Sequence, residues 1–195
     1  MKLFPHKPNI DILTDLGLKS GEKYLLLRFI SWTASHDFGQ AGFSSEIKLE
    51  IINKLESRYR IFISSEVALP PELEKYQLTV SPDRIHDILY FAELYIGEGA
   101  TMASEAAILG TPAIYVNSIQ AGTIDDQEKQ GLLFHICSKE AVFDKIDELS
   151  AFEDVKAPFK MRREKMLLEK VDVTAFLVWF VENWPKSMKR KSGIP

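Results

Sequence analysis

Short apolar runs alternate with helical patterns along most of this sequence. The first run has the near-continuous apolar composition of a strand that is covered on both faces, and the first helical pattern places apolar residues at helical spacing. The apolar runs lie at residues 23–30, 59–64, 76–80, 93–97, 112–116 and 132–137. The helical patterns lie at residues 44–58, 84–92, 123–131 and 138–149, and another begins at Thr101. This alternation predicts an α/β fold with a doubly wound, Rossmann-like parallel sheet of about six strands.

A sheet of this kind restricts where a ligand can bind. Because crossovers between parallel strands are right-handed, the loops that lead from strands into helices lie at one edge of the sheet. Ligands of such folds bind in a crevice at that edge. The loops after residues 30 and 96 both contain glycine and polar residues. We therefore expect the binding residues in these two loops.

The chain is expected to form one domain. Its 195 residues are enough for a sizeable core, and no repeat, low-complexity tract or flexible linker divides them. We expect a lead-in segment at 1–22, the sheet-containing domain at 23–184 and a basic tail at 185–195. From Phe159 onward the domain is predicted to be helical, with a break near 171–174 and Asp172 as the cap of the last helix.

The last predicted helix is apolar almost all round, and its aromatic residues point in several directions: Phe176, Trp179, Phe180 and Trp184. Such a helix is expected to be buried on more than one side. The preceding helix can cover it, or it can associate with a second copy of the chain or with another protein. Without such cover it would leave an apolar patch exposed.

Charge and composition argue against several classes of function. The formal net charge is −4, whereas a nucleic-acid-binding domain usually has a basic face. No apolar run is long enough to span a membrane, and the N-terminus lacks the apolar stretch of a signal peptide, so we expect a cytoplasmic protein without an integral membrane segment. The single cysteine and the scattered histidines form no metal-ligand pattern, so we expect no metal and no cofactor.

A glycine turn, Gly97-Glu98-Gly99, leads directly into a predicted helix. The start of a helix has unpaired N–H groups and a partial positive charge, so it binds phosphate readily. Gly99 and Ala100 lack the bulk to block a close approach, and Thr101 adds a hydroxyl. Glu105 follows about 6 Å further along the helix axis, where it can accept hydrogen bonds from a ribose diol. In the other interpretation, the glycine only permits the turn and Glu105 is an exposed side chain.

Four other residues have two interpretations each. His36 can donate a hydrogen bond to phosphate or transfer a proton near neutral pH, or it can anchor its own loop. Asp37 can orient His36 or simply belong to a turn. His86 opens the helix before residue 93 and can line a pocket or lie on the surface. Arg28 ends the first apolar run and can counter phosphate charge or pair with Glu66.

The segment "GATMASEAAILGTPAI" (99–114) resembles the nucleotide-binding segment of the GT-B superfamily. This superfamily includes the N-acetylglucosamine transferase of peptidoglycan synthesis and the non-hydrolysing UDP-N-acetylglucosamine 2-epimerases. The resemblance implies that the turn at 97–101 holds a diphosphate and that Glu105 binds the ribose. It also implies contacts to the nucleotide from four other residues: Met102 and Ser104 in the same segment, and Ile85 and His86 beside the base.

Two further stretches support the resemblance. "TASHDFGQAGFSSEI" (33–47) is similar to a loop of the epimerases in which a histidine matching His36 lies beside the nucleotide. The arginine and glutamate that follow this histidine in the epimerases are replaced by Asp37-Phe38-Gly39, which argues against epimerase chemistry. "DDQEKQGL" (125–132) resembles the transferase segment in which glutamines meet the donor sugar, which implies that role for Gln127. "ASHDFGQAG" and "GEGATMASEA" together resemble an uncharacterised bacterial and archaeal family of the same superfamily.

The resemblance implies a function for the whole chain. It would be the C-terminal, donor-binding domain of a GT-B protein, and its ligand would be UDP or a UDP-sugar. GT-B enzymes place the active site between two Rossmann-like domains, so we expect little turnover without an N-terminal partner domain. That domain, or a second copy of the chain, would pack on the last helix. Two alternatives are a non-catalytic binding or assembly module and a UDP-sugar 2-epimerase-like isomerase.

Overall fold

The computed structural model describes residues 7–31, 43–119 and 122–189. His36 and Asp37 lie outside the described residues. The strands are β1 (Tyr24–Phe29), β2 (Arg60–Ser65), β3 (Leu94–Gly97), β4 (Ala113–Val116) and β5 (Leu133–Ile136). The α-helices are α1 (Ile12–Asp15), α2 (Ser45–Leu55), α3 (Ile85–Phe91), α4 (Ala100–Leu109), α5 (Gly122–Lys129), α6 (Lys139–Ser150), α7 (Lys156–Glu169) and α8 (Val173–Glu182). Short 3₁₀ helices are η1 (Glu74–Tyr76), η2 (Pro82–Arg84) and η3 (Lys186–Lys189).

The strands form one parallel, five-stranded sheet in the order β2-β1-β3-β4-β5. The prediction of an α/β fold with a parallel sheet is therefore confirmed, but the prediction of about six strands is wrong. The expected strand at 76–80 is reduced to a single bridge between Gln77 and Ile63. Its apolar residues Leu78 and Val80 instead pack, half-buried, against the core on one face of the sheet, so the segment leaves the β2 edge after one bridge.

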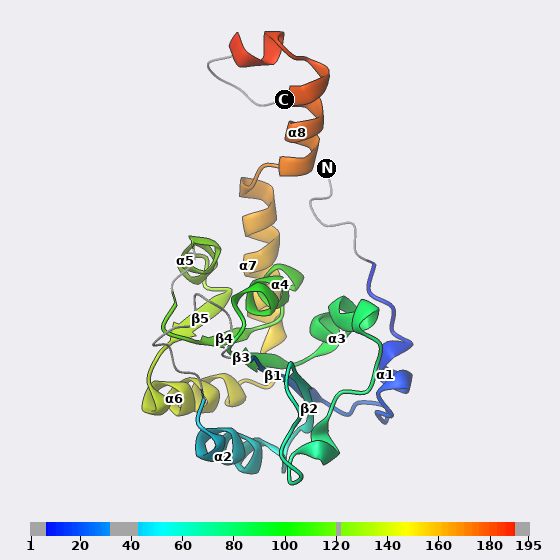
Figure 1. Ribbon diagram of the computed structural model, residues 1–195, viewed down its shortest axis with the longest axis vertical. Coiled ribbons are helices and arrows are strands. Elements are labelled where there is room, and N and C mark those ends of the chain that lie inside the picture. The colour runs from blue at the N-terminus through cyan, green and yellow to red at the C-terminus, as the bar shows by residue number, and fades with distance from the viewer. Residues whose placement is uncertain (1–6, 32–42, 120–121, 190–195) are drawn as a thin grey trace.

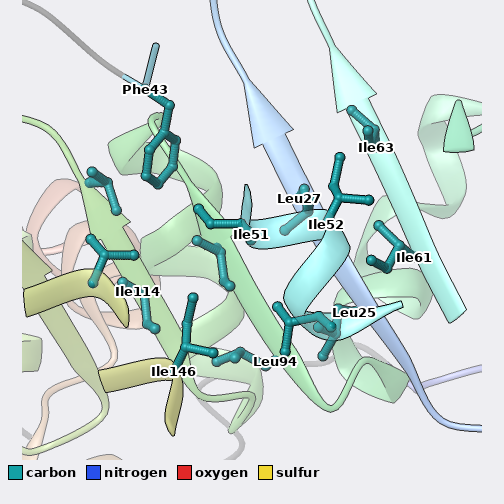
Figure 2. Close-up of a cluster of buried hydrophobic side chains, with 14 of the residues drawn as sticks. Leu25, Leu27, Phe43, Ile51, Ile52, Ile61, Ile63, Leu94, Ile114 and Ile146 are labelled. Carbon is teal, nitrogen blue, oxygen red and sulfur yellow. The ribbon is translucent and has the colours of Figure 1, made fainter. Parts of the chain in front are cut away.

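Side chains of each strand alternate between two cores, as the pleat of a strand requires. Leu25 and Leu27 of β1 point toward a cluster that includes Ile51 and Ile52 of α2 and Ile146 of α6 (Figure 2). Leu26 of β1 belongs to a second cluster, to which α1, α3, α4 and α5 contribute. Helices therefore cover both faces of the sheet, with α2 and α6 on one side and α3, α4 and α5 on the other (Figure 1).

The order of the strands creates a switch point between β1 and β3. From β1 the chain passes through α2 on one face to β2, whereas from β3 it passes through α4 on the opposite face to β4. The chain therefore leaves these two neighbouring strands toward opposite faces of the sheet, and a cavity lies at their carboxyl ends. In open α/β sheets this is the place where ligands bind.

Two arginines of α7 fix the ends of helices on the second face. Gly110 ends α4 with a φ of 83°, a left-handed conformation that suits glycine. Arg163 Nε donates to the carbonyl of Ile108 at 2.5 Å, in the last turn of α4. Arg162 donates to the carbonyl of Gly131 at 2.8 Å, just after α5. The arginines of α7 therefore satisfy carbonyl groups that helices leave unpaired at their C-termini.

Helix α8 is the last α-helix of the described chain. Asp172 caps it by accepting a hydrogen bond from the Ala175 N–H at 2.9 Å, as predicted. However, no residue of α8 is buried within the described chain, so the alternative in which the preceding helix covers it does not hold. The helix continues beyond α7, away from the sheet (Figure 1), and within the described chain it contributes to neither core cluster. Its exposed apolar residues include Leu177, Val178 and Val181.

No helix within the described parts of the chain has the length and apolar character needed to cross a membrane.

Candidate functional site

A cavity of about 510 Å³ lies at the switch point, at the carboxyl ends of the central strands. Its wall comes from the end of β1, the start of α4, the end of β4 and the residue that follows β2. The lining residues are Arg28, Ile30, Ser31, Glu66, Glu98, Gly99, Ala100, Thr101, Met102, Glu105, Tyr115, Asn117 and Ile119. Six residues that the sequence singled out as binding candidates or as a possible phosphate counter-charge therefore meet in one place: Arg28, Gly99, Ala100, Thr101, Met102 and Glu105.

Helix α4 presents its N-terminus to this cavity. The helix begins at Ala100, and its first three residues, Ala100 to Met102, all line the cavity. No side chain of the N-cap residue, Gly99, covers the helix end. The N–H groups of a first helical turn have no partner within the helix. An acceptor in the cavity can therefore approach several backbone donors and the positive end of the helix dipole together.

The two glycines of the turn have different roles. Gly97 is paired with Arg28 across β3 and β1. A Cβ on Gly97 would collide with the Tyr95 hydroxyl oxygen and would lie 2.7 Å from the Arg28 Cβ. The glycine therefore leaves room for both the Tyr95 and the Arg28 side chains. Gly99 has an ordinary φ of −93°, and an added Cβ would come no closer than 3.4 Å to Ile30. Only Gly99 lines the cavity.

Glu98, between these glycines, is fully buried and holds the cavity wall together. Its carboxylate accepts hydrogen bonds from the backbone N–H groups of Ile30 at 3.1 Å and Phe43 at 2.6 Å. Lys48 Nζ lies 3.8 Å from the same carboxylate. The Glu98 carbonyl accepts from Asn117 Nδ2 at 3.0 Å. Glu98 was not among the predicted site residues, although a charged side chain between two glycines was a visible signal.

Arg28 and Glu66 form an ion pair at the side of the cavity. Arg28 donates to Glu66 at 2.6 Å and to Ser64 Oγ at 2.8 Å. Glu66 also accepts from the backbone N–H and the hydroxyl of Ser31, both at 3.0 Å. The hydrogen bond from the Ser31 N–H is the main reason that the pKa of Glu66 lies below its ordinary value, with Arg28 adding to the effect. The sequence left two roles open for Arg28, and the structure shows the pairing with Glu66.

Glu105 lies on the cavity wall one turn into α4. Its Oε1 is 3.7 Å from Nε2 of His86, and both side chains are about one-third exposed, at 35% and 37%. His86 belongs to α3 and lies next to the lining residues without being one of them. Its neighbour Ile85 packs, half-buried, against the second core cluster. The structure thus brings Glu105 and His86 together beside the cavity, with the Glu105 carboxylate still accessible.

Gln127 lies apart from the cavity. It is 4% exposed, and its Nε2 donates to Ser104 Oγ at 2.7 Å between α5 and α4. Neither Gln127 nor Ser104 is among the lining residues. The Gln127 Oε1 is buried without a hydrogen-bond partner among the described residues. A contact between Gln127 and a sugar in the cavity would require this side chain to leave Ser104.

The residues after β4 close the remaining side. Asn117 is 4% exposed, and its Oδ1 accepts from the Ile119 N–H at 3.0 Å. The Tyr115 hydroxyl donates to the Ile119 carbonyl at 3.1 Å. Burial raises the pKa of this hydroxyl to about 12, so it remains a neutral donor at physiological pH. Tyr115 and Asn117 thus fix the turn after β4 against the turn that carries Glu98.

Charges on the cavity wall are mainly negative. Among the described lining residues, Glu66, Glu98 and Glu105 carry carboxylates and Arg28 carries the positive charge. Within the described residues, no group of three or more histidine, cysteine, aspartate or glutamate side chains is placed to hold a metal ion. The cavity is therefore built from backbone donors, one guanidinium and carboxylates.

Comparison with solved structures identifies proteins of similar fold. The chain is similar to a co-structure of MnaA from S. aureus with UDP, with a TM-score of 0.59 and 11% identity over 96% of this chain and 52% of the other. It is similar to a putative UDP-N-acetylglucosamine 2-epimerase from Listeria monocytogenes, with a TM-score of 0.55 and 15% identity over 99% and 52%. A third is the glycotransferase of kitacinnamycin, with a TM-score of 0.53 and 11% identity over 90% and 46%.

These likenesses show the fold, which is the Rossmann-like α/β fold of GT-B glycosyltransferases and UDP-N-acetylglucosamine 2-epimerases. The chain spans about half the length of each of these three structures. Residues 3–169 match the model of the family described as "Protein of unknown function (DUF354)", and the chain belongs to that family. No curated protein matches the sequence.

Proposed function

We propose that this chain is the nucleotide-sugar-binding half of a GT-B glycosyltransferase-like protein and that its cavity binds UDP or a UDP-sugar. The observation that carries the proposal is the arrangement around α4. The uncapped helix N-terminus and the Glu105 carboxylate, one turn further on, line the same cavity at the switch point. Backbone donors suit a diphosphate, and a carboxylate suits the two hydroxyls of a ribose.

The proposed ligand lies along the start of α4. Its diphosphate contacts the N–H groups of Ala100 to Met102 and the Thr101 hydroxyl. Its ribose reaches Glu105, which lies about 6 Å further along the helix at 1.5 Å per residue. The base then extends toward Ile85 and His86, since His86 lies 3.7 Å from Glu105. The diphosphate, ribose and base thus contact the protein in the order in which they are joined in a nucleoside diphosphate.

Three roles in the proposal rest on sequence resemblance. His36 and Asp37 would act beside the phosphates, and Gln127 would contact the sugar after releasing Ser104. Catalysis would then come mainly from positioning and from neutralising the charge of the leaving diphosphate at the helix N-terminus. The domain proposed for this role spans residues 23–184.

An N-terminal Rossmann-like domain is proposed to complete the active site, so this chain alone would bind nucleotide with little turnover. The exposed apolar residues of α8 support a partner at that helix, which is either such a domain or a second copy of the chain. A second candidate function is a UDP-sugar 2-epimerase-like isomerase, favoured by the fold shared with the putative epimerase from Listeria monocytogenes. The replacement of the epimerase residues after His36 by Asp37-Phe38-Gly39 disfavours it. A non-catalytic binding module is the third alternative.

Isothermal titration calorimetry with UDP, UDP-N-acetylglucosamine and other nucleoside diphosphates tests the proposal. We expect binding of UDP that Glu105→Ala weakens by about 10- to 100-fold, because a hydrogen bond to a charged group contributes about 1.5–3 kcal/mol. Glu164→Ala, at an exposed glutamate on α7, is the matched control and should leave the affinity unchanged. No heat of binding with any nucleotide at millimolar concentration would refute the proposal.

A further inference from the structure

We infer that Arg28 is the side chain through which the cavity recognises negative charge on its ligand. This inference deepens the proposed function and rests on it, because it assigns the phosphate-recognising residue of the same cavity. Arg28 is the fifth residue of β1, which lies between β2 and β3 in the sheet. In register it is flanked by Ser64 on one side and Gly97 on the other. Its side chain therefore reaches the cavity from the centre of the sheet edge.

The guanidinium is held in place but retains donors for a ligand. A guanidinium has five N–H donors in a planar fork. The side chain is 19% exposed, and its two side-chain hydrogen bonds run from one terminal nitrogen to Ser64 Oγ and from the other to Glu66. Donors thus remain for an acceptor in the cavity. Because Glu66 is itself fixed by Ser31, the orientation of the guanidinium is set before any ligand binds.

Two glycines, Gly97 and Gly99, leave room for the Arg28 side chain. The Arg28 Cγ lies 3.9 Å from the place where a Cβ of Gly99 would be, so the aliphatic part of the side chain runs along the turn before α4. Gly97 has no Cβ at the one point where a Cβ would collide with Arg28. The guanidinium and the backbone donors of α4 therefore border the same cavity. A bidentate guanidinium contact is a preferred way to bind phosphate oxygens.

The charges on the cavity wall indicate that Arg28 is important for binding a negatively charged ligand. The described lining residues carry three carboxylates and one cation, which is Arg28. A diphosphate adds at least two negative charges. Without Arg28, the wall would combine carboxylates with a dianion, and like charges in a partly desolvated cavity repel. The contribution of Arg28 should therefore depend on the charge of the ligand and should be absent for an uncharged nucleoside.

The experiment compares Arg28→Gln, Arg28→Lys and the wild-type chain by calorimetry with UDP, uridine and inorganic pyrophosphate. Lys54→Gln is the control for net charge, since Lys54 pairs with Asp147 on the surface and does not line the cavity. We expect Arg28→Gln to weaken UDP binding by about 10- to 100-fold and to leave uridine binding unchanged. The affinity of Arg28→Lys for UDP should lie between those of the wild type and Arg28→Gln, because lysine keeps the charge and loses the planar fork.

Each outcome decides the inference. If Arg28→Gln unfolds, which circular dichroism detects, Arg28→Lys carries the comparison. Equal affinity of the wild type and the Arg28 variants for UDP would overturn the inference and leave the proposed function standing. If the wild type binds no nucleotide, the proposed function fails, and pyrophosphate then decides the inference. Binding of pyrophosphate that depends on Arg28 would support it, whereas binding that is absent or independent of Arg28 would overturn it.

Discussion

The carboxylate of Glu98 accepts a hydrogen bond from the backbone N–H of Phe43 at 2.6 Å, although the two residues are 55 positions apart in the sequence. The same carboxylate accepts from the Ile30 N–H. A single buried side chain in the turn before α4 therefore holds two backbone segments, one at the end of β1 and one just before α2. The turn after β3 is thereby joined to the described residues on either side of the connection from β1 to α2.

Glu98→Gln is expected to lower the free energy of unfolding by about 1–3 kcal/mol, because an amide keeps one acceptor oxygen where the carboxylate has two and leaves a buried N–H without its partner. Urea denaturation measures the change. Glu164→Gln, at an exposed position on α7, is the control and should change stability by less than about 0.5 kcal/mol. Equal stability of the two variants would show that Glu98 does not hold these segments.

Gly97→Ala and Gly99→Ala form a matched pair with opposite expectations. An alanine Cβ at residue 97 would lie 2.7 Å from the Arg28 Cβ, whereas one at residue 99 would meet Ile30 at 3.4 Å. We expect Gly97→Ala to cost about 1–3 kcal/mol through overpacking and Gly99→Ala to cost less than 1 kcal/mol. Thermal unfolding of both variants checks this, at about 2–4 °C per kcal/mol for a domain of this size. A reversed order would contradict the assignment of Gly97 to packing.

The stability of the protein should depend on pH through the buried Lys156. Its Nζ is buried and donates to the Tyr90 carbonyl, and burial lowers its pKa from 10.5 to about 8. Between pH 8 and 10.5 the unfolded chain therefore binds more protons than the folded protein, so this group makes stability rise with pH. The full effect is on the order of 3 kcal/mol. Burial also raises the pKa of Tyr24 and Tyr95, which works in the opposite direction at higher pH.

Urea denaturation of the wild type and Lys156→Met from pH 7 to 9.5 measures the free energy of unfolding of both proteins. Because the methionine has no charge to lose, the variant should lack the increase in stability that the lysine causes over this range. Parallel pH profiles for the two proteins would rule out the proposed effect of burial.

Helix α8 should contribute little to the stability of the sheet. Leu177 and Val181 are 54% and 71% exposed and belong to neither core cluster. Leu177→Ser and Val181→Ser should therefore change the free energy of unfolding by less than about 0.5 kcal/mol. Ile146→Ser, at a fully buried position of α6, should cost at least 2 kcal/mol, on the order of other large-to-small changes in cores. Chemical denaturation of the three variants tests whether α8 folds onto the body of the protein.

Local patterns in the sequence predicted much of the fold. The alternation of apolar runs and helical patterns predicted the five observed strands, because each strand is a short, largely apolar run between helices. Asp172 was predicted as the cap of the last helix, and it accepts from the Ala175 N–H at 2.9 Å. The segment at 76–80 was mistaken for a strand, because an apolar run looks the same whether it pairs with a neighbour or packs on a core.

The contacts that build the cavity could be predicted only in part. The position of Glu105 relative to the glycine turn follows from sequence spacing, since the turn leads directly into the helix that carries Glu105. The pairing of Arg28 with Glu66 depends on the register of β1 and β2, which no local pattern reveals. The buried role of Glu98 likewise depends on Phe43, far away in sequence. The burial of α8 depends on what packs around it, which its apolar composition alone does not reveal.

A crystal structure of this chain with UDP would show whether the nucleotide binds at the start of α4. We expect the diphosphate against the backbone N–H groups of Ala100 to Met102 and the ribose hydroxyls on the Glu105 carboxylate. UDP bound elsewhere, or a cavity that stays without UDP at millimolar concentration while Glu105 remains turned to His86, would contradict this expectation.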